Sequence, residues 1–128
     1  MEAKEFRFAF FARDFERSVS FYQDTLGMRY VSGWDRPDGK GALLSAGGNA
    51  VVEIYGAAEG KAYDGPSPVA INLAIRLSSE ADVNNLYDQL DSAGVDLEGA
   101  PQNRPWGHRS FILHDPDTIP IHCYCEIE

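Results

Sequence analysis

The sequence predicts an α+β fold of two βαβββ modules in tandem, whose curved mixed sheets surround a cavity. The main observation is a repeat: the order strand, helix, three strands occurs once in each half of the chain. The turn-forming segment Gly65-Pro66-Ser67-Pro68 separates the halves. A chain of 128 residues is one ordinary domain. We therefore predict a single domain, with module one at about 5–56, a linker at about 57–68 and module two at about 69–128.

The first module opens with an apolar, partly alternating run at 6–11 that predicts a strand. Asp14 is a helix N-cap candidate and Gly27 a stop. Between them, an apolar helical face repeats at four-, three- and four-residue steps: Phe15, Val19, Tyr22 and Leu26. Three further strands are predicted at 28–34, 41–46 and 50–55, separated by turn formers.

The second module repeats this order. A strand is predicted at 69–77, and Ser79 with Asp82 three residues later resembles a capping box. The helix that follows has an apolar stripe and ends at Gly94; the stripe consists of Val83, Leu86, Tyr87 and Leu90. The remaining strands are predicted at 95–97, 110–114 and 120–127.

The last two strands are predicted to form a hairpin, because the residues between them are turn formers. Asp115 and Asp117 can hydrogen-bond their own backbone, and Pro116 presets one dihedral, so the strands meet in one register. Alternation then places His122 and Tyr124 on the less apolar face of the final strand. This face is a candidate wall for a ligand cavity.

Composition excludes several classes of partner. A formal net charge of −9 argues against nucleic acid and anionic membrane surfaces, which need basic patches. No apolar run approaches the ~20 residues of a membrane-spanning helix, and no signal peptide is visible at the N-terminus. Cys123 and Cys125, two apart on one strand, are poorly placed for a disulfide. We therefore expect buried free thiols and a cytoplasmic protein.

Two segments of the sequence resemble those of a known superfamily. The segment 14–27, DFERSVSFYQDTLG, resembles the first helix of the vicinal oxygen chelate superfamily, also called the glyoxalase, bleomycin-resistance and ring-cleaving dioxygenase fold. Pro105-Trp106-Gly107 with Arg109, Phe111 and Asp115-Pro116-Asp117 resembles its closing hairpin. The resemblance covers nearly the whole chain. It implies the fold first, because this fold hosts unrelated functions.

The resemblance also implies four cavity-facing positions, at which metal-dependent members carry mostly histidine or glutamate. In this chain they fall on Arg7, Glu53, Asn72 and His122. Arginine offers only donors and cannot be a ligand, and Asn72 offers at most a neutral carbonyl. Glu53 and His122 remain as plausible ligands, and two are rarely enough for a tight site. We therefore expect no cofactor; a divalent metal held by Glu53 and His122 is the alternative.

Without a metal, the four positions suggest a polar binding site. We hypothesise that Arg7 is the built-in counter-ion of a partly buried Glu53, while Asn72 and His122 orient a small polar ligand. Aromatic residues on or next to the cavity strands complete the predicted ligand-binding set: Phe11, Trp34, Trp106 and Tyr124. In a purely structural interpretation, His122 is a satisfied histidine and Arg7–Glu53 a structural bridge. A site of His114 with His122 lies outside the family pattern.

Two function classes follow. In the first, the chain is a small-molecule-binding member of the superfamily that lacks the usual metal site. In the second, it is a glyoxalase-like lyase, isomerase or dioxygenase that uses Glu53 and His122 as metal ligands, or one of them as an acid or base. Arg7 and Asn72 favour the first class. The resemblance also implies a homodimer, because short members of the superfamily complete their cavities by pairing two chains.

Overall fold

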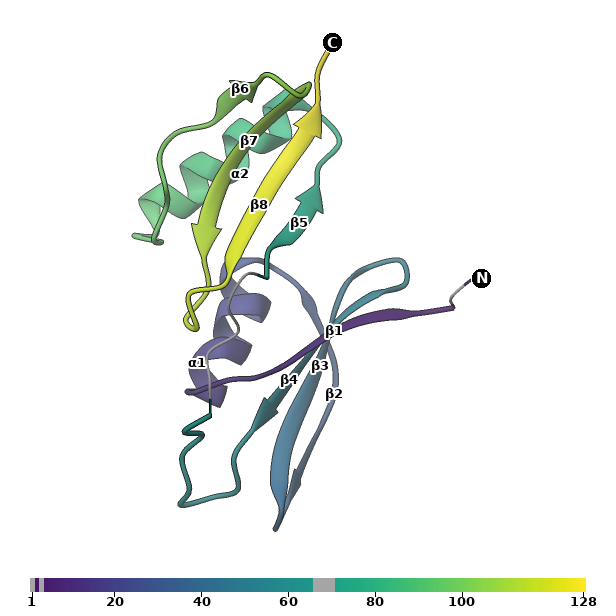
Figure 1. Ribbon diagram of the computed structural model, residues 1–128, viewed down its shortest axis with the longest axis vertical. Helices are drawn as coiled ribbons and strands as arrows, with labels where there is room; N and C mark the ends of the chain where they lie inside the picture. Colours follow the sequence, from purple (N-terminus) through teal and green to yellow (C-terminus); the bar gives the residue numbers. More distant parts are fainter. Residues whose placement is uncertain (1, 3, 66–70) are drawn as a thin grey trace. The chain divides into compact units, whose positions relative to one another are not determined.

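The chain forms two compact units, Met1–Ser67 and Pro68–Glu128. The computed structural model describes residues 2, 4–65 and 71–128, and each unit contains one four-stranded mixed sheet and one α-helix (Figure 1). The predicted α+β fold with tandem βαβββ modules is confirmed. Of the predicted linker motif, residues 66–68 lie outside the described residues.

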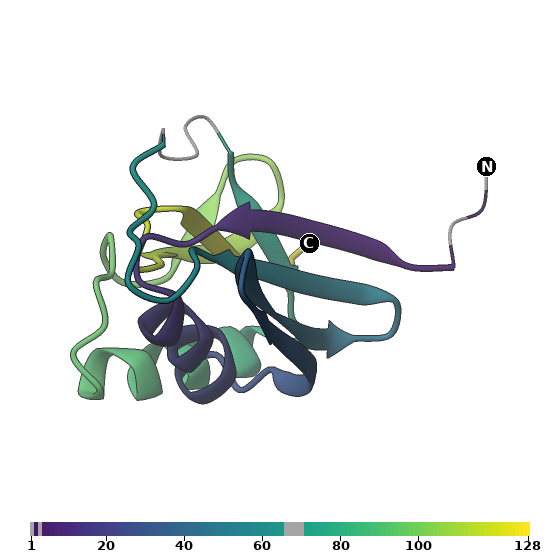
Figure 2. The ribbon, with the colours of Figure 1, turned by 90° about the horizontal axis from the view of Figure 1, so that it is seen from below.

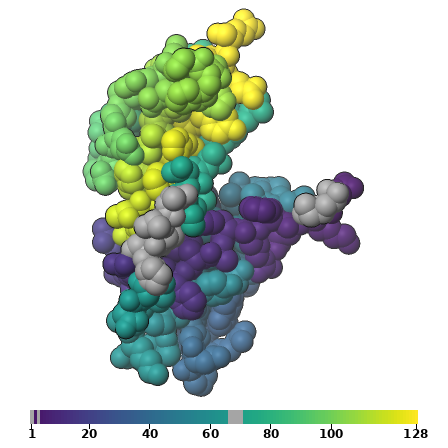
Figure 3. Space-filling model, in the orientation of Figure 1, coloured from purple at the N-terminus to yellow at the C-terminus, as the bar shows by residue number. Residues whose placement is uncertain are grey.

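The first unit contains a sheet of strand order β1-β4-β3-β2, in which β1 runs parallel to β4 and the other pairs are antiparallel. Its elements are β1 (Phe6–Phe11), α1 (Phe15–Ser20), the π-helical turn η1 (Phe21–Thr25), β2 (Arg29–Arg36), β3 (Gly39–Gly47) and β4 (Ala50–Gly56). β1 is an edge strand, and part of this N-terminal segment, coloured purple, lies at the surface in the space-filling view (Figure 3); its residue Phe10 is buried. All four strands predicted in this module are present.

The first helix begins as the sequence predicts and then widens. The Asp14 side chain accepts a hydrogen bond from the Arg17 backbone N–H at 3.1 Å, which caps α1. From Phe21 onward the helix continues as a π-helical turn, closed by the Leu26 N–H on the Phe21 carbonyl at 3.0 Å. Gly27, at φ +75°, ends it. The single α-helix predicted to Leu26 is therefore corrected in its second half.

The helix covers one face of the first sheet (Figure 2). Tyr22 is fully buried there and packs on Phe10, with ring centroids 5.9 Å apart. The other buried apolar residues of this unit are Ala12, Ala42, Leu44, Val52 and Ile54. Because side chains alternate along a strand, the β4 residues next to Val52 and Ile54 project from the opposite face of the sheet.

The second unit contains a sheet of strand order β5-β8-β7-β6, with β5 parallel to β8. Its elements are β5 (Leu73–Arg76), α2 (Glu80–Ser92), β6 (Gln102–Arg104), β7 (His108–His114) and β8 (Pro120–Glu126). The described part of the strand predicted at 69–77 is shorter than expected. The strand predicted at 95–97 is wrong: only a single bridge between Leu97 and Leu113 forms there, and β6 is the fourth strand instead.

Helix α2 lies on one face of the second sheet. The Ser79 hydroxyl accepts the Asp82 N–H at 3.1 Å, as the capping box predicts. Tyr87 packs edge-on against Phe111 at 5.6 Å, and Arg109 donates from Nε to the Asn84 amide oxygen at 2.9 Å. Within the described residues, no helix has the length and apolar character needed to cross a membrane.

The cysteines lie on the face of β8 that α2 covers. Cys123 and Cys125 are free thiols with at most 1% of their surface exposed, as the sequence predicts. Burial raises the pKa of the Cys123 thiol to about 12, because the apolar surroundings disfavour the thiolate. Cys123 therefore has the character of a core residue and not of a nucleophile.

The turn between β7 and β8 fixes the register of the final strand. The Asp115 carboxylate accepts the backbone N–H groups of Asp117 and Ile119, at 2.9 and 2.8 Å, and is 5% exposed. Thr118, within this turn, has φ +66°. Burial then alternates along β8, so that His122 and Tyr124 lie on the face opposite Cys123. The predicted alternation is confirmed.

Candidate functional site

Arg7 and Glu53 form an ion pair on the face of the first sheet opposite α1. β1 and β4 pair in parallel with Arg7 opposite Val51, so Arg7 and Glu53 project from the same face. Arg7 Nη1 lies 3.1 Å from Glu53 Oε1, and Arg7 Nε contacts the Glu5 carboxylate. The Glu53 side chain is 14% exposed and that of Arg7 42%. The pair hypothesised from the sequence is thus present, with its carboxylate sheltered and its guanidinium half open to solvent.

A tyrosine completes this network. The Tyr55 hydroxyl hydrogen-bonds to the Glu53 carboxylate, which raises the pKa of Tyr55 above its ordinary value. The carboxylates of Glu5 and, second, Glu53 raise the pKa of the Arg7 guanidinium. The Glu53 carboxylate is therefore shared between a fixed cation and a phenol.

This arrangement does not fit a metal site. A metal on Glu53 would have to compete with a guanidinium that cannot be deprotonated and would repel the ion. Among the residues that the structure describes, no three side chains of the His, Cys, Asp and Glu types are grouped as a metal site requires. The donors around Glu53 thus match a carboxylate held by hydrogen bonds.

Glu53 and Arg7 are expected to move the pKa of Tyr55 in opposite directions. Glu53→Gln removes the hydrogen bond that raises this pKa most and should lower it; Arg7→Met removes a cation that lowers it and should raise it further. Ultraviolet absorbance of tyrosinate during an alkaline titration measures both shifts, with Tyr55→Phe identifying the Tyr55 component. Equal titration curves for the three chains that retain Tyr55 would contradict the network.

Aromatic side chains flank the network on the same sheet. The Tyr55 ring lies 5.1 Å from that of Phe11 and 6.3 Å from that of Trp34, and Phe11 also stacks on Tyr63 at 5.2 Å. The Trp34 ring lies over Gly41, where a Cβ atom would come within 2.2 Å of it. The predicted residues Phe11 and Trp34 thus share one neighbour, Tyr55.

The second unit contains a cavity of about 310 Å³ on the sheet face opposite α2. Its lining combines aromatic rings with small and polar side chains: Asn72, Leu73, Ala74, Trp106, His108, Ser110, His122 and Tyr124. Four predicted ligand-binding residues, Asn72, Trp106, His122 and Tyr124, thus line one cavity.

Strand pairing brings these residues together. Ser110 lies opposite Tyr124 in the β7–β8 pair, and Ala74 lies opposite His122 in the β5–β8 pair. The His108 ring stacks on Tyr124, with centroids 4.3 Å apart and planes 19° from parallel. Trp106, in the turn between β6 and β7, is 65% exposed.

His108 and Ser110 are cavity residues that the sequence did not single out. The signal was available, because the turn at Asp115 sets the β7–β8 register and alternation along β7 then assigns both residues to the His122 face. Arg104 donates from Nε to the Ser110 hydroxyl at 2.9 Å. His114 does not line this cavity; its Nε2 atom lies 3.0 Å from Glu98 Oε2.

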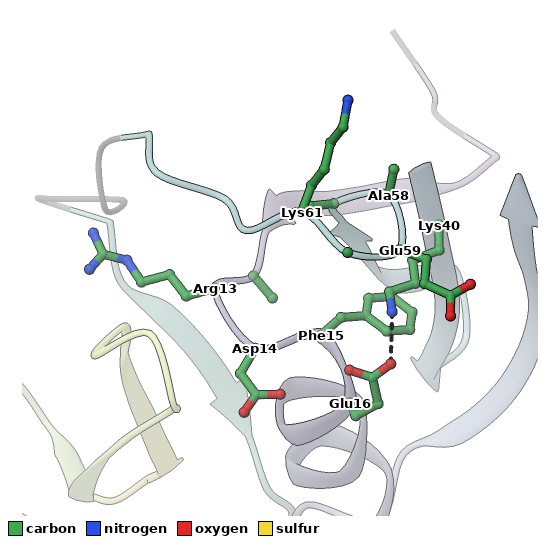
Figure 4. Close-up of a pocket in the computed structure, with 11 residues that line it drawn as sticks. Arg13, Asp14, Phe15, Glu16, Lys40, Ala58, Glu59 and Lys61 are labelled. Atoms are coloured by element: carbon green, nitrogen blue, oxygen red, sulfur yellow. Dashed lines mark hydrogen bonds and ion pairs between the residues drawn. The ribbon is translucent and has the colours of Figure 1, made fainter. Parts of the chain in front are cut away.

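A second hollow, of about 280 Å³, lies in the first unit between the start of α1 and residues 57–61 (Figure 4). Two of its charged side chains pair with each other: Lys40 Nζ lies 2.8 Å from Glu16 Oε1 and also over the Phe15 ring. This hydrogen bond raises the pKa of Lys40 and lowers that of Glu16. Arg13 and Lys61 extend away from the hollow. The second-unit cavity, with its stacked aromatic wall, is the better candidate for a ligand site.

Comparisons with known proteins agree with this architecture. The chain is 33% identical over 121 residues to the uncharacterized protein YraH of Bacillus subtilis (strain 168), covering 87% of this chain and 89% of YraH. It resembles the crystal structure of a glyoxylase/bleomycin resistance protein/dioxygenase domain from Frankia sp. EAN1pec, with a TM-score of 0.81, 16% identity and coverage of 100% and 94%. It also resembles a glyoxalase/bleomycin resistance protein/dioxygenase from Nocardioides, with a TM-score of 0.77, 22% identity and coverage of 100% and 85%. Residues 6–122 match the family pattern, and the chain belongs to the Glyoxalase/Bleomycin resistance protein/Dioxygenase superfamily.

Proposed function

We propose that this chain is a small-molecule-binding member of the superfamily, which holds its ligand through aromatic and hydrogen-bonding side chains and without the usual metal. The observation that carries this proposal is the second-unit cavity of about 310 Å³, in which Trp106, Tyr124 and His122 lie together. Ligand pockets in proteins have this size and this mixture of apolar walls with a few polar groups.

The proposal predicts that the cavity residues control binding. We would screen the full chain by NMR against small aromatic amides, phenols, carboxylates and amines, following the indole N–H resonance of Trp106. For a ligand that shifts this resonance, Trp106→Ala should weaken binding about tenfold or more, because an aromatic contact in a pocket contributes about 1–2 kcal/mol.

Gln89→Ala is the control, since Gln89 is exposed on α2, on the other side of the sheet from the cavity, and carries no charge. It should leave the affinity unchanged. A screen in which no compound affects Trp106, or ligands that bind equally to the Trp106→Ala variant, would contradict the proposal.

The second candidate function is a glyoxalase-like lyase, isomerase or dioxygenase that uses Glu53 and His122. The engagement of Glu53 by Arg7 and Tyr55 supports the binding function over this one. Elemental analysis of protein purified without chelator or affinity nickel separates the two. We expect far less than one metal ion per chain; a near-stoichiometric divalent metal that Glu53→Gln or His122→Ala removes would favour the enzyme.

We also propose that the protein acts as a homodimer in the cytoplasm. Support for association comes from large apolar residues exposed on the edge strands β1 and β2, among them Phe6 at 75% and Val31 at 46%. The two free thiols suit a reducing compartment. Sedimentation at micromolar concentration should give a dimer, and a monomer would contradict this part of the proposal. Fractionation of cells that produce the chain tests the location.

A further inference from the structure

We infer that the second-unit cavity selects an uncharged, planar ligand whose edge carries both a hydrogen-bond donor and an acceptor, such as a heteroaromatic amide. This inference rests on the proposed binding function and names its ligand class. It begins from the lining, in which none of the eight side chains carries a formal charge at pH 7 when histidine is neutral.

The shape of the site favours a flat molecule. The stacked rings of His108 and Tyr124 present a planar wall. Trp106, with 65% of its surface exposed, offers a large indole surface beside that wall. Ala74, opposite His122, occupies little space. Aromatic rings bind other rings by offset stacking or edge-to-face contact, so a planar ring system uses these surfaces best.

The polar groups favour a ligand that both donates and accepts. The Asn72 amide has an acceptor oxygen and a donor NH₂, and a neutral His122 ring has one donor and one acceptor nitrogen. Both side chains line the cavity. Ser110 already receives a hydrogen bond from Arg104. An amide edge matches the pairing that Asn72 and His122 offer, whereas a carboxylate or an ammonium matches only half of it.

The acidic side chains of the second unit give the cavity little negative potential. The second unit has ten of the twenty acidic residues and three of the eleven basic ones. Four of the acids belong to α2, on the other side of the sheet, at Glu80, Asp82, Asp88 and Asp91. A helix packs about 10 Å from its neighbours, and salt screens exposed charges beyond about 8 Å at physiological ionic strength.

Of the charged groups near this face, Arg76 is ion-paired and Arg104 is held by neutral hydrogen-bond partners. Arg76 lies 3.3 Å from Glu126, and Arg104 contacts Ser110 and Gln102. A charged ligand would lose part of its hydration in the cavity without gaining an opposite charge in contact, which is costly. A neutral ligand avoids this cost.

Calorimetry at pH 8 with three probes of matched shape tests the inference on the full chain. The probes are quinoline-4-carboxamide, which is neutral, quinoline-4-carboxylate, an anion, and N-methylquinolinium-4-carboxamide, a cation. We expect the neutral amide to bind at least about tenfold more tightly than either ion, a difference of about 1.4 kcal/mol. Its affinity should fall in Trp106→Ala and His122→Ala and stay unchanged in Gln89→Ala.

Asn72→Asp is the charge-matched variant, because it adds a carboxylate to the lining without changing its shape. It should improve binding of the cation about fivefold or more and weaken that of the amide. An ion that binds the unaltered chain as tightly as the amide, through Trp106, would overturn the ligand class and leave the proposed function standing. Failure of all three probes to bind would also overturn the inference, while the broader NMR screen decides the proposed function independently.

Discussion

Replacing Asp115 by alanine is expected to lower the free energy of unfolding by about 2–4 kcal/mol, because two backbone N–H groups lose their acceptor and each costs about 1–3 kcal/mol when buried and unsatisfied. The Asp115 carboxylate holds the N–H groups of Asp117 and Ile119 and is 5% exposed. Urea denaturation of the two chains measures the difference. Since this turn sets the β7–β8 register, the NMR resonances of His122 and Tyr124 should also shift in the folded variant.

Asp115→Asn separates the hydrogen bonds from the charge. The asparagine keeps an acceptor oxygen in the same place, so it should recover at least half of the loss. An alanine variant that is as stable as the original chain, or an asparagine variant no better than alanine, would contradict this role of the turn.

The buried Cys123 thiol is expected to make the protein lose stability at alkaline pH. Its pKa is about 12 in the folded chain, against 9.0 for an ordinary thiol. An acid whose pKa is raised by folding contributes fully below the unfolded value, and its contribution is lost as pH rises through the folded value. The loss should therefore run from about pH 9 to about pH 12 and reach on the order of 4 kcal/mol.

Urea denaturation at several pH values between 8 and 12 tests this, with Cys123→Ala as the comparison. Tyrosine and lysine residues titrate in the same range in both chains, so the difference between the two slopes isolates the thiol. At pH 8 the free energy of unfolding of the alanine variant should be lower, because the core loses volume, and it should fall less steeply as the pH rises. Parallel pH profiles would show that the thiolate forms without cost in the folded protein.

Local chemistry in this chain was predictable from the sequence. Asp14, Ser79 and Asp115 each bond backbone groups within four residues, so residue type and spacing decide the contact. The starts of both helices and the final turn follow from such short-range bonds. The strands around them follow from apolar alternation.

Elements that depend on distant partners were not predictable in the same way. Gln102–Arg104 has no apolar alternation and becomes strand β6 because it pairs with β7, where Arg104 reaches Ser110. The predicted strand at 95–97 has the apolar residues but makes only one bridge. The π-helical turn at Phe21–Thr25 interrupts a spacing that suits an ordinary α-helix, and no residue in it marks the change.

The residues of the candidate site also differ in how far the sequence alone could predict them. The side of the final strand on which Tyr124 and His122 lie follows from alternation, whereas Arg7 and Glu53 were selected by the resemblance to the superfamily. His108 lies before the strand predicted at 110–114, and its stack on Tyr124 depends on the longer strand β7 that the structure has. The roles of these residues toward a ligand stay predictions.

The backbone at Thr118 has a consequence for engineering the protein. A β-branched residue at φ +66° is held in a conformation that costs about 1–2 kcal/mol for any residue with a Cβ. Glycine adopts it freely, although part of the gain is lost to the greater freedom of the unfolded chain. Thr118 is exposed and does not line the candidate cavity. Thr118→Gly can therefore raise the thermal stability of the protein. This gain can offset destabilising substitutions that are introduced to change the ligand specificity.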